Sequence, residues 1–152
     1  MPLSLQEISD RFEIQDLLYR YAQIIDAQDF DALKTEIFHP DAQIDYSVFG
    51  GPKGSLDEIV TFLKQAMPVF SNTQHLNANM QIKVEGDTAT GRIMCFNPQE
   101  MNLGPEKGKH LFMLGLWYVD QYVRTENGWR IMERAEEKSW HFNLPDFMRF
   151  DN

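Results

Sequence analysis

The fold is decided by residues 110–141, which read HLFMLGLWYVDQYVRTENGWRIMERAEEKSWH. Two segments rich in β-branched and aromatic residues, 110–124 and 129–141, flank the dipeptide Asn127-Gly128. This dipeptide favours the tight turn of a β-hairpin, because both of its residues tolerate positive φ angles. The stretch therefore predicts two long antiparallel strands at the C-terminal end of a sheet.

A second hairpin is predicted directly upstream. Segments 73–84 and 88–97 flank Glu85-Gly86-Asp87, and residues 98–109, with two glycines and a proline, predict a loop between the hairpins. The tail from Pro145 carries Phe147, Met148 and Phe150, so we expect it to dock on its own domain or on a neighbouring subunit.

The N-terminal half predicts helices. Residues 5–26 repeat apolar side chains at helical spacing, at Ile14, Leu18, Tyr21 and Ile25. A short second helix is expected to begin at the N-cap Asp29 and to end at His39-Pro40, and a third to begin at the capping box Ser55-Leu56-Asp57-Glu58 and to end at Pro68. Between the last two, residues 42–48 alternate as a strand, with Ala42, Ile44, Tyr46 and Val48 on one face.

This order predicts an α+β class of fold over residues 1–152, read as a single domain. Helices would pack on one face of a curved antiparallel sheet, and the concave side of such a sheet can enclose a pocket.

Composition argues against several classes of function. The formal net charge of −9 disfavours binding to nucleic acid or to an anionic membrane surface. No apolar run approaches the ~20 residues of a membrane span, and no signal peptide is visible, so we expect a cytoplasmic protein. Cys95 is the only cysteine, and the four histidines show no spacing typical of metal ligands. We therefore expect neither a metal nor another cofactor.

Two short motifs carry the candidate chemistry, Tyr21…Asp26 at the end of the first helix and Thr73-Gln74-His75 at the start of a strand. A histidine that contacts a carboxylate inside an apolar pocket acts as a general base. Two interpretations of each residue remain open. Asp26 lies at the margin of the apolar arc and could be a solvated helix end, and strict alternation places His75 on the polar face of its strand. A functional His75 therefore requires a polar cavity or a β-bulge.

These motifs resemble the nuclear transport factor 2-like cone fold, and within it the SnoaL-like group that includes scytalone dehydratase. The resemblance spans nearly the whole chain. It is carried by Tyr21-x4-Asp26, Asp29-Phe30-Asp31-Ala32-Leu33, Ile44-Asp45-Tyr46, Thr73-Gln74-His75, Glu85-Gly86-Asp87-Thr88-Ala89 and Gly128-Trp129.

The resemblance implies roles at the matching positions. His75 matches the histidine that removes a proton from carbon, and Asp26 its carboxylate partner. Tyr46 matches a tyrosine near the substrate carbonyl, and Tyr21 a helix tyrosine of the bile-acid dehydratase in this group; packing is the alternative role for both.

The residues expected to bind substrate depart from the relatives. Asn97 stands where the bile-acid enzyme has Asp, and Lys138 where that enzyme and hexachlorocyclohexane dehydrochlorinase have Arg. Trp117 could be a core residue or a wall of a pocket for an aromatic ligand.

The function implied is a cofactor-independent lyase. A dehydratase acting on a hydroxylated carbonyl, polyketide, steroid or aromatic compound fits best, and the partner expected is a small hydrophobic or aromatic substrate. A ketosteroid-isomerase-like isomerase, a polyketide cyclase and a non-catalytic small-molecule-binding domain remain alternatives. Relatives imply a homotrimer or homodimer formed through the sheet face.

Overall fold

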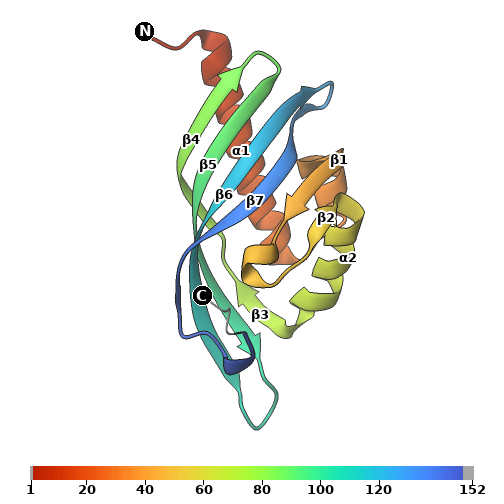
Figure 1. Ribbon diagram of the computed structural model, residues 1–152, viewed down its shortest axis with the longest axis vertical. Helices are drawn as coiled ribbons and strands as arrows, with labels where there is room; N and C mark the ends of the chain where they lie inside the picture. Colours follow the sequence, from red (N-terminus) through yellow and green to blue (C-terminus); the bar gives the residue numbers. More distant parts are fainter. Residues whose placement is uncertain (1, 149–152) are drawn as a thin grey trace.

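The computed structural model describes residues 2–148 (Figure 1). Its elements follow the expected order, with two helices and seven strands in the described residues. They are α1 (Leu5–Ala27), a π-helical turn (Leu33–Ile37), β1 (Phe38–Asp45), β2 (Lys53–Ser55), α2 (Leu56–Ala66), β3 (Phe70–Thr73), β4 (Leu76–Glu85), β5 (Thr88–Asn102), β6 (Lys109–Thr125) and β7 (Gly128–Phe142). Single 3₁₀ turns cover Ser47–Phe49, Met67–Val69 and Asp146–Met148.

All seven strands belong to one sheet, in the order β2-β1-β7-β6-β5-β3, and β4 also pairs with β5. The β1–β7 pair is parallel, and the other pairs are antiparallel. In Figure 1, α1 runs along one face of this curved sheet, and α2 lies beside β1 and β2. The predicted α+β architecture, with helices packed on a curved sheet, is confirmed.

Helix α1 buries the apolar stripe that the sequence predicts. Ser4 caps its N-terminus, because the Ser4 hydroxyl accepts a hydrogen bond from the Glu7 N–H at 3.1 Å. At the other end Gln28 takes the left-handed conformation, with φ 57°, and stops the helix. Asp26 therefore occupies the last turn of α1, close to the sheet. No helix within residues 2–148 combines the length and the apolar character needed to cross a membrane.

The segment between α1 and α2 differs in part from the prediction. The turn after α1 ends at Ile37 rather than at His39-Pro40, and β1 covers Phe38–Asp45 instead of residues 42–48. Tyr46 follows the strand, although its side chain is buried as predicted. Val48 is exposed, because the 3₁₀ turn interrupts the strand alternation.

The predicted start of α2 is confirmed. The Ser55 hydroxyl accepts a hydrogen bond from the Glu58 N–H, and the Glu58 carboxylate accepts one from the Ser55 N–H at 2.7 Å. This reciprocal cap directs α2 along β1, where its buried side chains join the core.

Strands β3 and β4 lie end to end along one edge of β5. β3 ends at Thr73 and β4 begins at Leu76, so only Gln74 and His75 separate them. The Gln74 N–H donates to the Pro98 carbonyl at 3.0 Å, which keeps this break on the sheet. The loop predicted for residues 98–109 is wrong at its start, since β5 continues through Pro98 to pair with β3.

A β-bulge follows the break. Between Ala78 and Gln81, β4 holds one residue more than the paired part of β5, and Asn79 has a φ of 45°. The extra residue reverses the alternation, so Asn77 before it and Ile82 after it are both buried. The β-bulge, one of the two features that an inward-facing His75 was expected to require, is therefore present.

A buried ion pair joins β6 to β7. Arg134 donates to both oxygens of Asp120, at 2.8 and 2.7 Å, and both side chains are fully buried. The guanidinium also lies 4.3 Å from the ring centroid of Tyr21 and 3.9 Å from that of Tyr118. These cation–π contacts join Tyr21 of α1 and Tyr118 of β6 to the ion pair, and the Tyr122 hydroxyl donates a further hydrogen bond to Asp120.

We predict that Arg134→Ala strongly destabilises the protein. It leaves the Asp120 carboxylate buried without its partner, which typically costs about 3–5 kcal/mol of unfolding free energy. Urea denaturation followed by circular dichroism measures this loss. Lys83→Ala breaks only the exposed Lys83–Glu85 pair and should leave the denaturation midpoint unchanged. Equal midpoints for the two variants would contradict the role assigned to the buried pair.

Candidate functional site

The Asp26 carboxylate is the anchor of the candidate site. Its Oδ1 accepts hydrogen bonds from the Thr73 hydroxyl at 2.9 Å and from Nδ1 of His75 at 2.7 Å. Its Oδ2 accepts one from the His75 backbone N–H at 3.1 Å. The structure thus brings the two motifs into direct contact, and Asp26 is not a solvated helix end.

His75 occupies the break between β3 and β4, and its side chain is only 8% exposed. Because Asp26 binds Nδ1, the neutral ring carries its proton there, and the lone pair is on Nε2. No residue within 2–148 forms a hydrogen bond with Nε2, and His75 is part of the wall of a cavity. The imidazole therefore borders the cavity and leaves Nε2 without a hydrogen-bond partner among the described residues.

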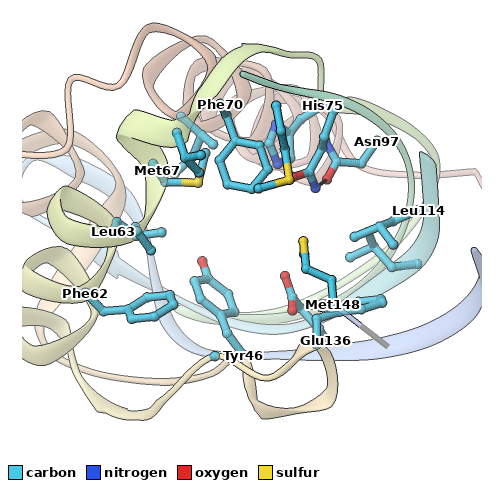
Figure 2. A pocket seen from close by; sticks show the side chains of 18 of the residues that line it. Tyr46, Phe62, Leu63, Met67, Phe70, His75, Asn97, Leu114, Glu136 and Met148 are labelled. Carbon is cyan, nitrogen blue, oxygen red and sulfur yellow. Dashed lines mark hydrogen bonds between the residues drawn. The ribbon is translucent and has the colours of Figure 1, made fainter. Parts of the chain in front are cut away.

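The cavity has a volume of about 310 Å³ and lies between α2, the sheet and the C-terminal turn. In Figure 2, His75 and Asn97 lie on one side of it, and Tyr46 and Glu136 lie on the other. Most of the remaining wall is apolar, including Phe62, Leu63, Met67, Phe70, Met101, Leu114, Leu116 and Met148. Such a wall excludes water and suits a hydrophobic ligand.

Two phenols share a hydrogen bond in this wall. The hydroxyls of Tyr21 and Tyr46 lie 2.9 Å apart, and both side chains are buried. Burial raises the pKa of each phenol, so both stay protonated and can donate hydrogen bonds. Gly51 allows the approach of the loop that holds Tyr46, because a Cβ at this position would lie 2.9 Å from the Tyr46 carbonyl oxygen.

Glu136 is a pocket residue that the sequence analysis missed. It lies on β7, opposite Tyr118 of β6, and its carboxyl points into the cavity (Figure 2). Burial raises the pKa of Glu136 to about 8. Little in the sequence signals this position, because Glu136 lies in a strongly charged run that is typical of a solvated strand. Its one signal was that it lies two residues from Lys138, so alternation places both side chains on the same face of the strand.

The three predicted substrate-binding residues differ in position. Asn97 lines the cavity, and its amide donates to the Gln74 carbonyl at 2.8 Å and accepts a hydrogen bond from Gln99. Lys138 lies two residues beyond Glu136 and is not part of the cavity wall.

Trp117 lies away from the cavity, contrary to one of its two predicted roles. Leu114, Leu116 and Tyr118 face the cavity, so alternation along β6 turns Trp117 to the outer face of the sheet. There its ring packs against the Arg92 guanidinium, at 3.8 Å from the ring centroid. It is not a wall of this cavity.

The C-terminal tail docks on its own domain, which was one of the two expected arrangements. Phe147 and Met148 form part of the cavity wall, whereas Phe150 lies outside the described residues. Between residues 2 and 148, no group of three or more His, Cys, Asp or Glu side chains is arranged to hold a metal ion.

Comparison with protein families gives a match over most of the chain. The model of the SnoaL-like domain matches residues 6–135. The chain belongs to the SnoaL-like domain family. A relative in this family, the uncharacterized protein Rv2910c of Mycobacterium tuberculosis H37Rv, is 46% identical over 136 residues, which cover 90% of each chain.

Two solved structures are similar in fold. A candidate scytalone dehydratase from Novosphingobium aromaticivorans superposes with a TM-score of 0.79, at 17% identity, and covers 91% of this chain and 89% of its own. The hexachlorocyclohexane dehydrochlorinase LinA-type3 of Novosphingobium barchaimii gives a TM-score of 0.76 at 16% identity, over 97% of this chain and 99% of its own. At this level of identity the likeness is one of fold, and it confirms the expected SnoaL-like and nuclear transport factor 2-like resemblance.

Proposed function

We propose that this protein is a cofactor-independent lyase, of the dehydratase type, in which His75 is the general base. One observation carries the proposal. His75 hydrogen-bonds to Asp26 at 2.7 Å and, with little exposure to bulk water, borders an apolar cavity. A solvent-exposed histidine would have favoured a non-catalytic binding domain, and this arrangement argues against that alternative.

The first step is removal of a proton from a carbon next to a carbonyl group. Nε2 of His75 accepts the proton, and the Asp26 carboxylate stabilises the imidazolium that forms. Thr73 and the His75 backbone N–H fix the carboxylate, so the pair needs no reorganisation during the reaction.

Negative charge then develops on the carbonyl oxygen of the substrate. Tyr46 can donate to this oxygen from across the cavity, with Tyr21 as the partner of its hydroxyl. As the carbon–oxygen bond breaks, the imidazolium returns its proton to the departing hydroxyl, which leaves as water. The products are an unsaturated carbonyl compound, water and neutral His75.

Proton abstraction next to a carbonyl is also the first step of an isomerase or a cyclase, so these remain the alternative reactions. The volume of the cavity constrains the size of the substrate more than it constrains the type of reaction. A volume of about 310 Å³ lies at the lower end of the range for ligand pockets. This favours an aromatic or polyketide compound of one or two rings over a steroid.

We predict that His75→Ala lowers kcat by ~100- to 10,000-fold, because a positioned proton acceptor is lost. Turnover of a panel of hydroxyketones and phenolic polyketides, read by ultraviolet absorbance, provides the assay. His141→Ala is the matched control, since His141 is exposed on β7 and lies away from the cavity. If a substrate of the wild type is turned over at full rate by His75→Ala, His75 is not the base.

We also propose that the chain forms a homodimer or homotrimer through the outer face of its sheet. Partly exposed apolar side chains gather there, and the rings of Phe96 and Trp140 pack with centroids 5.8 Å apart. Exposed apolar patches of this kind mark interaction surfaces. The outer apolar cluster consists of Met94, Phe96, Trp117, Val119, Trp140 and Phe142.

We predict that the paired change Phe96→Glu and Trp140→Glu converts the oligomer to a monomer. Two carboxylates placed in the outer apolar cluster would have to be buried unpaired at the interface. Size-exclusion chromatography with light scattering measures the mass. Phe12→Glu, at an exposed site on α1, should keep the wild-type mass. A monomeric wild type would refute the proposal.

A further inference from the structure

Glu136 is a half-buried residue whose carboxyl has no hydrogen-bond partner in the described part of the chain. It borders the cavity, yet no residue within 2–148 forms a hydrogen bond or an ion pair with its carboxyl. Structural carboxylates elsewhere in the fold are paired, as Asp120 is with Arg134 and Asp10 with Arg124. A carboxyl left without a protein partner at the wall of an apolar pocket is available to a ligand.

Burial raises the pKa of Glu136 by more than the positive charge of Arg134 lowers it. Arg134 lies two residues away on β7, but its guanidinium is bound by both oxygens of Asp120 and covered by the rings of Tyr21 and Tyr118. Asp45, at the end of the neighbouring strand β1, adds a negative charge that further disfavours ionisation of Glu136.

Other titratable groups near Glu136 come from several elements of the fold. Phenols and a thiol, all with pKa values raised by burial, come from the other elements, and the base lies across the cavity (Figure 2). The phenols and the thiol belong to Tyr21 on α1, Tyr46 after β1, Tyr118 on β6 and Cys95 on β5, and the base is His75 between β3 and β4. One further cation, Lys138, lies two residues beyond Glu136 on β7.

We propose that Glu136 is a recognition residue that donates a hydrogen bond from its neutral carboxyl to an oxygen atom of an uncharged ligand. The pocket then selects neutral ketones, alcohols and phenols over carboxylates, because an anion would meet a carboxyl in an apolar wall. This inference rests on the proposed function only for the location of the pocket. It does not depend on the reaction.

If Glu136 donates this hydrogen bond, ligand binding weakens as the pH rises. The carboxyl is neutral below its pKa of about 8 and ionised above it, and the ionised form offers acceptors only. If only the neutral form binds an acceptor oxygen, the apparent Kd rises roughly 30-fold between about pH 6.5 and about pH 9.5.

Isothermal titration calorimetry with 1-tetralone, a neutral bicyclic ketone, tests this. The wild type should bind 1-tetralone at about pH 6.5 and lose roughly 30-fold in affinity at about pH 9.5. Glu136→Gln keeps a neutral donor that cannot ionise, so its Kd should be nearly the same at both pH values. Glu137→Gln is the matched control. It removes the neighbouring carboxylate, which pairs with Arg92 on the outer face at 2.9 Å, and should keep the wild-type pH dependence.

Three outcomes with 1-tetralone alone would overturn the inference. These are no binding of 1-tetralone by the wild type, equal affinity at both pH values, and a pH dependence that persists in Glu136→Gln. Tighter binding of 1-naphthylmethylammonium at high pH, with no effect on 1-tetralone, would assign Glu136 to cationic ligands and would also overturn it. The same titration of His75→Ala separates this inference from the proposed base. Its pH dependence should be retained even though turnover is lost.

Discussion

Three hydrogen bonds to one carboxylate hold the candidate site together. Asp26, in the last turn of α1, accepts from the Thr73 hydroxyl, the His75 backbone and the His75 ring. These bonds join the end of the first helix to the break between β3 and β4. Thr73 and His75 lie 47 and 49 residues beyond Asp26 along the chain. Charge-assisted hydrogen bonds of this kind are the stronger ones in proteins. The three bonds fix the orientation of the imidazole, against which the Tyr21 ring also packs edge-on, with centroids 6.4 Å apart.

The sheet makes this contact possible through two irregularities. The break at Gln74 and His75 frees the histidine from the strand pairing, and the bulge at Asn79 lets the same strand bury Asn77 before it and Ile82 after it. Asn97 on β5 supports the break through the Gln74 carbonyl. Irregularities in strands are over-represented beside functional sites, and here they carry a polar group to the apolar side of a sheet.

Most of the fold could be predicted from local patterns. The capping box at Ser55, the apolar stripe of α1 and the turn at Asn127-Gly128 each depend on residues that are close in sequence. The candidate site depends on strand irregularities and on pairings between residues that are far apart in the sequence. The face of His75 depends on the break between β3 and β4 and on the bulge that follows it, neither of which alternation reveals. The position of Trp117 is set by the cavity-facing parity of Leu116 and Tyr118. Glu136 resembles a surface residue in sequence and becomes a pocket residue only through the pairing of β6 with β7.

The central claim is that Asp26 holds the proton of neutral His75 on Nδ1 and leaves Nε2 as the base. Long-range ¹H–¹⁵N NMR correlation of the histidine rings tests it directly and needs no substrate. We predict a protonated Nδ1 and an unprotonated Nε2 for neutral His75. In Asp26→Ala the preference for this tautomer should be lost. A neutral ring with its proton on Nε2, or with equal populations of the two tautomers, would contradict it.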